Sequence, residues 1–163
     1  MLYFAYGSNL NPRNMKVRCP GAKRHGPLTL PGGRLVFRNC ADVVTDPDSV
    51  IAGGVWRITK EHERELDRYE GVSSNFYKKK YLRLKINSGP GEDCLYYQMQ
   101  TKTGIQPPNE DYYNMILEGY RWFGLDENLL TQALHESWEN KQLTPMLRAR
   151  RHRKGYPRLQ KTG

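Results

Sequence analysis

The spacing of the apolar residues changes near residue 107, and this change limits the chain to a fold that combines strands with a helical C-terminal part. Before this point, apolar and aromatic residues form short runs separated by glycine, proline and polar residues, which is typical of strands. After it, Tyr112, Met115 and Ile116 recur at helical spacing. This order predicts an α+β fold, a small mixed β-barrel-like sheet with flanking helices.

The strand region divides into short segments. Expected strands cover residues 1–6, two pieces of 27–39 around a Pro-Gly-Gly turn at 31–33, then 49–58, 75–86 and 93–100, with a loop at 41–49. The last two strands read as a β-hairpin across a Gly-Pro-Gly turn. Paired Gly53 and Gly54 inside a strand indicate a bulge or the close approach of another group.

Four helices are predicted from their end signals. Asn11 precedes Pro12 as an N-cap, and Thr59 caps a charged surface helix that ends at Glu70 and Gly71. A third helix stops at Gly124, and Asp126 caps a fourth that runs to about residue 138.

The 163 residues suit one domain with its own core. No run approaches the roughly 20 apolar residues of a membrane span, and the apolar start is too short for a signal peptide, so we expect a cytoplasmic protein with no membrane partner. The net charge is +9, but residues 141–163 carry eight basic and no acidic side chains. We therefore expect a nearly neutral domain at 1–140 and a flexible basic tail at 141–163.

Cysteine and histidine spacing predicts neither a disulfide framework nor a metal site. Three scattered cysteines lack any C-x-x-C pair, and no two histidines fall on one helical face. The residues concerned are Cys19, Cys40, Cys94, His25, His62, His135 and His152. We expect reduced thiols and no metal.

Two features could carry chemistry. In the first, an apolar strand ends abruptly at Gly7, Ser8 and Asn9, leaving backbone N–H groups that either bind an oxygen-bearing ligand or simply form a turn. In the second, Glu70 stands where a surface helix stops at Gly71. It is either one more solvated carboxylate or a partly buried acid whose pKa rises from about 4.3.

Together, three segments resemble the γ-glutamylcyclotransferase-like family. "YFAYGSNL" at 3–10 is similar to its N-terminal signature, "LDRYEGV" with "FYKKKYLRLKI" to its acidic motif and following strand, and "PPNEDYYNMILEGYRWFGLDENLL" to its C-terminal pattern. The motifs occur in the family's order and span residues 2–134. Tyr120 and Asp126 depart from the family's usual alanine and proline.

The resemblance implies a small β-barrel with flanking helices, no cofactor, and conversion of a γ-glutamyl amide to 5-oxoproline and a free amine. It assigns the catalytic role to Glu70 and a ligand contact to Tyr112. The implied substrate-binding segment comprises Tyr3, Phe4, Ala5, Tyr6, Gly7, Ser8 and Asn9, most directly Gly7 and Ser8.

Such a reaction accounts for these residue types. The substrate's α-ammonium must lose a proton before it attacks its own γ-carbonyl, and one carboxyl can take that proton and return one to the departing amine. The loop amides would bind either the substrate carboxylate or the developing oxyanion. Loops at 41–49 and 73–76 are expected to form the rim that sorts γ-glutamyl substrates.

The alternative is a non-catalytic binding module. Its working part would be "RARRHRKGYPRLQK" in the tail, whose arginines suit nucleic acid or an acidic partner. A solubilising tail explains the same composition, and the neutral body favours that interpretation.

Overall fold

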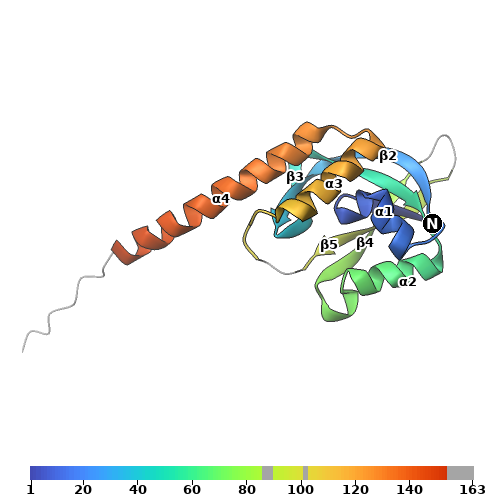
Figure 1. Cartoon of the computed structure of the whole chain (residues 1–163), viewed down its shortest axis with the longest axis horizontal. Helices are drawn as coiled ribbons and strands as arrows, with labels where there is room; N and C mark the ends of the chain where they lie inside the picture. Colours follow the sequence, from blue (N-terminus) through green and yellow to red (C-terminus); the bar gives the residue numbers. More distant parts are fainter. Residues whose placement is uncertain (86–89, 101–102, 154–163) are drawn as a thin grey trace, which may run out of the picture.

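The computed structural model describes residues 1–85, 90–100 and 103–153, which form a mixed sheet with helices, as predicted for the α+β class (Figure 1). The strands are β1 (Leu2–Ala5), β2 (Lys23–Arg38), β3 (Cys40–Arg57), β4 (Tyr77–Leu84) and β5 (Glu92–Met99). The α-helices are α1 (Pro12–Arg18), α2 (Lys60–Tyr69), α3 (Glu110–Phe123) and α4 (Glu127–Arg153), with short 3-10 helices η1 (Ser8–Leu10) and η2 (Val72–Ser74).

The first strand lies at the centre of the sheet. The strand order is β2-β3-β1-β5-β4, with β1 antiparallel to β3 and parallel to β5. All four residues of β1 are buried, which explains its continuous apolar run. Among the described residues β2 and β4 are edge strands. The sheet is therefore open and does not close into a barrel, so the predicted barrel-like form applies only loosely.

Residues 23–57 form one long hairpin, where the sequence predicts a bend at 31–33 and a loop at 41–49. The chain reverses at Asn39, whose φ of 65° is left-handed, and Arg38 pairs with Cys40. Pro31 pairs with Val50 and Gly33 with Thr45, so the register shifts at the expected turn, and residues 46–49 have no paired partner in β2. Residues 41–45 of the expected loop are instead paired with 33–37, because hydrogen bonds to the partner strand outweigh the local turn preference of these residues.

The predicted helix ends are confirmed at four positions. The Asn11 side chain accepts from the backbone N–H of Arg13, and that of Thr59 accepts from His62. Gly124 is left-handed after α3, and Asp126 accepts from the backbone N–H of Asn128 in α4. These are the local interactions that satisfy unpaired groups at helix ends.

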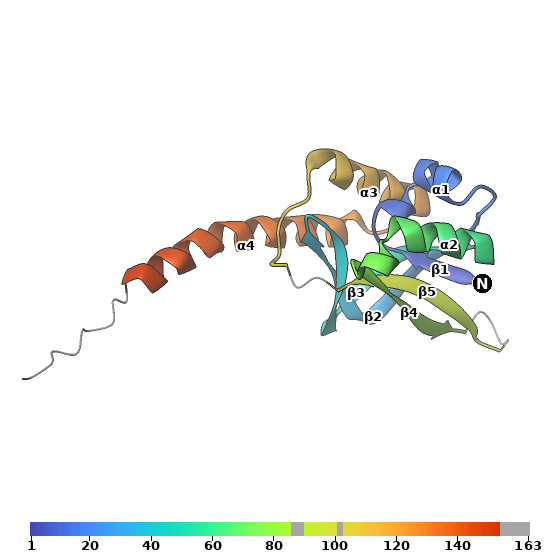
Figure 2. The same ribbon diagram turned by 90° about the horizontal axis from the view of Figure 1, so that it is seen from below.

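Helices α1, α2 and α3 lie on one side of the sheet, and α4 extends away from it (Figure 2). The sequence predicts that α4 ends near residue 138, but the helix continues to Arg153. Residues 139–153 contain one proline, Pro145, but no glycine and many good helix formers, such as leucine, arginine and glutamine. Part of the expected tail is therefore helical, and residues 154–163, expected to be flexible, lie outside the described residues.

No helix in the described ranges is long and apolar enough to cross a membrane. The buried residues form a core between the sheet and its helices, contributed by β1, β3, β5 and α3. Phe4, Trp56, Leu95 and Ile116 are representative members, each at most 4% exposed.

Close approach of other groups explains the glycine pair. A Cβ added at Gly53 would lie 2.5 Å from the carbonyl oxygen of Ala5, and one added at Gly54 would lie 2.2 Å from the ring of Phe123. Both distances are far inside van der Waals contact. The two glycines therefore let β1 and α3 pack directly on β3.

The packing of Phe123 on Gly54 generates a stability prediction. Gly54→Ala should lower the free energy of unfolding by about 1–3 kcal/mol, because the added methyl overfills a closed site. Chemical denaturation of both proteins measures the difference. Gly104→Ala is the matched control, since no atom lies within 4 Å of its added Cβ; equal losses at the two positions would contradict the explanation.

Candidate active site

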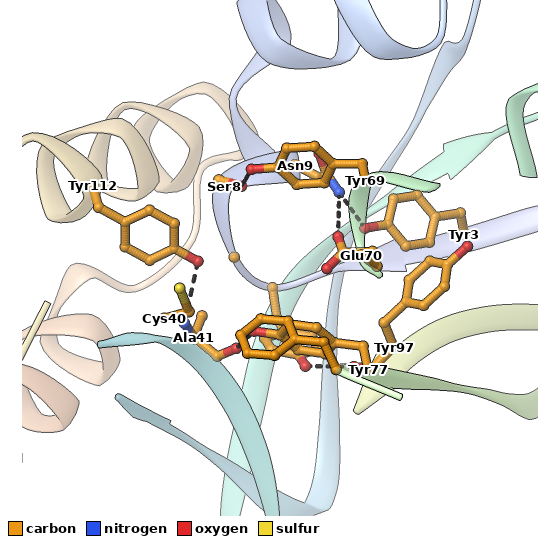
Figure 3. Close-up of a pocket in the computed structure, with 13 residues that line it drawn as sticks. Tyr3, Ser8, Asn9, Cys40, Ala41, Tyr69, Glu70, Tyr77, Tyr97 and Tyr112 are labelled. Atoms are coloured by element: carbon orange, nitrogen blue, oxygen red, sulfur yellow. Dashed lines mark hydrogen bonds between the residues drawn. The ribbon is translucent and has the colours of Figure 1, made fainter. Parts of the chain in front are cut away.

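Glu70 is the residue at which α2 ends. Its backbone N–H donates to the carbonyl of Leu66 at 2.8 Å, and the following Gly71 has a left-handed φ of 62°. The turn stops the helix and directs the Glu70 side chain into a cavity lined by β1 and its neighbours (Figure 3). The Glu70 carboxylate therefore lies in the cavity, whereas the acidic residues earlier in α2 suggested a solvated position for it.

The segment 7–9 reaches the same cavity from the end of β1. Asn9 is 2% exposed, and its carbonyl accepts a hydrogen bond of 3.0 Å from the indole Nε1 of Trp56 on β3. η1 closes on the carbonyl of Gly7 through Leu10 N–H, so the earlier N–H groups of Ser8 and Asn9 have no acceptor among the described residues. The predicted free amides are therefore present.

A hydrogen-bond network joins this segment to Glu70. Asn9 Nδ2 donates to Glu70 Oε1 at 2.9 Å and to the Tyr3 hydroxyl at 2.8 Å. Because Tyr3 accepts there, its own O–H stays available to a ligand. Burial raises the pKa of Glu70 from 4.5 to about 7, opposed by the charge of Arg18 and the bond from Asn9.

Arg18, at the end of α1, contacts this network through hydrogen bonds and through the ring of Tyr69. Its Nη1 donates to Asn9 Oδ1 and, at 3.2 Å, to Ser8 Oγ. The guanidinium also stacks on the ring of Tyr69 at 3.3 Å. Since Oδ1 of Asn9 faces Arg18, its Nδ2 faces Glu70. The arginine therefore fixes which end of the Asn9 amide meets the carboxylate.

The cavity has a volume of about 190 Å³. Of the predicted site residues, its lining contains Tyr3, Tyr6, Gly7, Ser8 and Asn9, together with Glu70 and Tyr112. Phe4 and Ala5 do not line it: the Phe4 ring packs near Gly53, and Ala5 pairs with Gly54. The alternation of strand side chains accounts for Phe4, which points to the other face from Tyr3.

Tyr112 closes the opposite wall from the first turn of α3. Its hydroxyl accepts from the backbone N–H of Ala41 at 3.1 Å, which leaves its O–H free to donate into the cavity. A Cβ at Gly7 would lie 3.4 Å from this hydroxyl and 3.1 Å from Cβ of Ala41. The strand-to-helix loop, α3 and β3 thus meet closely at this wall.

Six further lining residues are not among the predicted site residues. They are Cys40, Ala41, Tyr69, Phe76, Tyr77 and Tyr97. Ala41 and Phe76 fall in the segments expected to form the rim. Tyr77 pairs with Met99 and Lys79 with Tyr97, so the hairpin register places both tyrosines on one face, a signal present in the alternation of the two strands.

These tyrosines support the wall through hydrogen bonds to the protein. Tyr77 donates to the carbonyl of Ala41 at 2.6 Å, Tyr97 donates to Asp67 Oδ1 at 2.8 Å, and Tyr6 donates to the carbonyl of Tyr97. The described residues contain no group of three or more histidine, cysteine or carboxylate side chains arranged to hold a metal ion.

Comparisons with known proteins show the family to which this chain belongs. Residues 3–122 match the family described as gamma-glutamyl cyclotransferase, AIG2-like. The chain belongs to this family. The γ-glutamylcyclotransferases of Bos taurus and Homo sapiens are each 30% identical over 136 residues, covering 76% of this chain and 72% of theirs. A solved structure named gamma-glutamyl cyclotransferase superposes with a TM-score of 0.71 at 27% identity, covering 82% of this chain and 85% of its own.

Within this family fold, the burial of Glu70 should be visible in stability. Because its folded pKa of about 7 exceeds the unfolded value near 4.5, the folded state holds the proton more tightly, and stability falls as the pH rises between these values. Relative to the wild type, Glu70→Gln should gain on the order of 3 kcal/mol in unfolding free energy between pH 4.5 and 8.

Urea denaturation across this pH range measures the gain. Glu65→Gln, an exposed carboxyl on the same helix, is the matched control for converting an acid to an amide. A wild-type-minus-Glu70→Gln difference that stays constant with pH would show that Glu70 has the same pKa folded and unfolded.

Arg18 generates a second prediction for the site. Its positive charge lowers the pKa of Glu70 against the effect of burial, so Arg18→Met should raise that pKa above 7. Carboxyl carbon NMR titration of glutamate-labelled protein, with Glu70→Gln for assignment, measures it. Lys16→Met, exposed on the same helix, is the control; identical titrations for the two variants would remove Arg18 from the electrostatics of the site.

Proposed function

We propose that the chain cyclises a γ-glutamyl amide to 5-oxoproline with release of the free amine. The observation that carries this proposal is the Glu70 carboxyl, whose pKa is raised to about 7 inside a cavity bordered by unpaired loop amides. A carboxyl with this pKa holds and releases a proton with similar ease near neutral pH. The names of the related enzymes support the same reaction.

Ionised Glu70 would act first as a general base. Only Oε1 is engaged by Asn9, so Oε2 is left to meet the substrate's α-ammonium. Removing one proton exposes the nitrogen lone pair. The amine then attacks the γ-carbonyl carbon of the same molecule, so the protein chiefly has to hold the substrate folded.

Ring closure places negative charge on the former carbonyl oxygen. The N–H groups of Ser8 and Asn9 and the O–H groups of Tyr3 and Tyr112 are donors of the cavity lining that would meet either this oxygen or the substrate carboxylate. Uncharged donors suit the site, because a lysine or arginine in the lining would stabilise ionised Glu70 and lower its pKa.

Protonated Glu70 would then act as a general acid. The carbon–nitrogen bond to the leaving amine breaks as Glu70 delivers its proton to that nitrogen. Glu70, ionised again, would take the second proton from the ring nitrogen and return it to the released amine. Over the cycle the α-nitrogen loses two protons and the released amine gains two, so the reaction consumes neither water nor a net proton. No second titratable group is required.

The alternative, a non-catalytic binding module with a working basic tail, accounts less well for the site. A module that binds through its basic tail gains nothing from burying a carboxyl in a separate cavity against its solvation. In the cyclisation proposal, burial raises the pKa of Glu70 into the range that suits proton transfer. The reaction does not require the tail.

Activity assays test the proposal directly. With a panel of γ-glutamyl amino acids and γ-glutamyl amines, the wild type should release 5-oxoproline with a kcat/KM that rises with pH up to about 7 and then levels, because the ionised carboxylate is the active form. Glu70→Gln should lower kcat by at least about 100-fold.

Glu65→Gln again serves as the control. Near-normal turnover by Glu70→Gln would remove Glu70 from the mechanism, and a wild type that releases 5-oxoproline from no member of the panel would favour the binding module.

A further inference from the structure

The mouth of the active-site cavity is aromatic. Among the thirteen residues that line the cavity, Tyr69 and Phe76 are the two whose side chains are exposed, at 49% and 41%. The others are buried or half-buried. Whatever part of a substrate extends out of the cavity therefore passes these two rings.

Both rings are held in place by the turn that positions Glu70. Tyr69 precedes Glu70 directly, and Arg18 covers one face of its ring at 3.3 Å. Phe76 follows η2, with its N–H bonded to the carbonyl of Gly71 at 3.1 Å and its carbonyl to Gln100 N–H at 2.9 Å. Its ring packs edge-on against Tyr77 at 5.1 Å. Both rings at the mouth are therefore packed against neighbouring groups.

The chemistry of the reaction decides which part of the substrate meets these rings. The polar groups of the γ-glutamyl half, its carboxylate, ammonium and γ-carbonyl, have their partners inside, beside Glu70 and the 7–9 loop. These partners place the γ-glutamyl half at the inner wall of the cavity. The substituent on the departing nitrogen must therefore lie at the mouth.

Charge at the cavity argues for an uncharged substituent. Among the described residues that line the cavity, Glu70 is the one with a carboxylate or basic side chain. Arg18, whose Nη1 donates to Asn9 and Ser8, lies outside the lining and against the Tyr69 ring. A carboxylate on the leaving amine would find aromatic surface there, whereas an apolar group would remove that surface from water.

We propose that Tyr69 and Phe76 form a specificity-determining subsite for the leaving amine, so that the chain prefers γ-glutamyl amides of amines with an aromatic or aliphatic substituent. The proposal rests on the proposed cyclisation, and it names the substrate class that the reaction leaves open. A pocket contact of this kind discriminates by about 10–200-fold.

Kinetics with three γ-glutamyl amides test the subsite: those of phenethylamine, methylamine and glycine. We expect the wild-type kcat/KM for the phenethylamide to exceed both others at least about 10-fold. In Phe76→Ala and in Tyr69→Ala the phenethylamide-to-methylamide ratio should fall towards one. Trp138→Ala, an aromatic residue 46% exposed on α4, is the matched control and should leave the ratio unchanged.

A binding measurement separates this proposal from the cyclisation itself. Calorimetry of Glu70→Gln with the same three amides reports the subsite without turnover. Preferential binding of the phenethylamide that Phe76→Ala in the same background abolishes would support the subsite even if the wild type releases no 5-oxoproline. Release of 5-oxoproline with a ratio near one, or with a ratio that neither substitution changes, would overturn the subsite and leave the cyclisation standing. If Glu70→Gln shows no binding preference for the phenethylamide and the wild type releases no 5-oxoproline, both the subsite and the cyclisation are overturned.

Discussion

The side chain of Asn9 joins the two halves of the site, and the arrangement of the other groups depends on it. It donates to Glu70 and Tyr3 and accepts from Arg18, while its carbonyl accepts from Trp56. Four elements, α2, β1, α1 and β3, therefore meet at one buried residue. A buried amide satisfied on every side has a single orientation, which sets the position of the carboxylate relative to the loop amides.

The sheet topology places this residue where it can act. β1 lies between β3 and β5, and the segment 7–9 leaves its end beneath α3, where a Cβ added at Gly119 would lie 2.4 Å from Cβ of Leu10. Close packing from α3 on one side and Trp56 on the other keeps the short η1 helix fixed. The loop amides are consequently rigid donors, which is what stabilisation of a developing charge requires.

The site is built at the expense of stability. Burial that raises the pKa of Glu70 to about 7 means that its ionised form is poorly solvated in the folded state. Arg18 and Asn9 offset part of this cost, and they leave a pKa in the range useful for moving protons. An exposed glutamate at the end of α2 would favour the fold and lose this property.

The sequence by itself determined the element types, most helix ends and the family. Period changes, the caps at Asn11, Thr59 and Asp126, and the stop at Gly124 act between neighbours in the chain, so local patterns reveal them. The three motifs assigned Glu70, the 7–9 loop and Tyr112, and the structure brings these into one cavity.

Tertiary structure alone decided the burial of Glu70, its hydrogen-bonded surroundings with Arg18 and Trp56, and the pairing of residues 41–45 with 33–37. Asn9 and Glu70 are 61 positions apart, and the desolvation that shifts the carboxyl's pKa comes from residues scattered over the chain. Local sequence carries no measure of that burial. The pairing of β2 with β3 likewise overrides the loop preference of residues 41–45, because hydrogen bonds to a partner strand outweigh what a short segment favours alone.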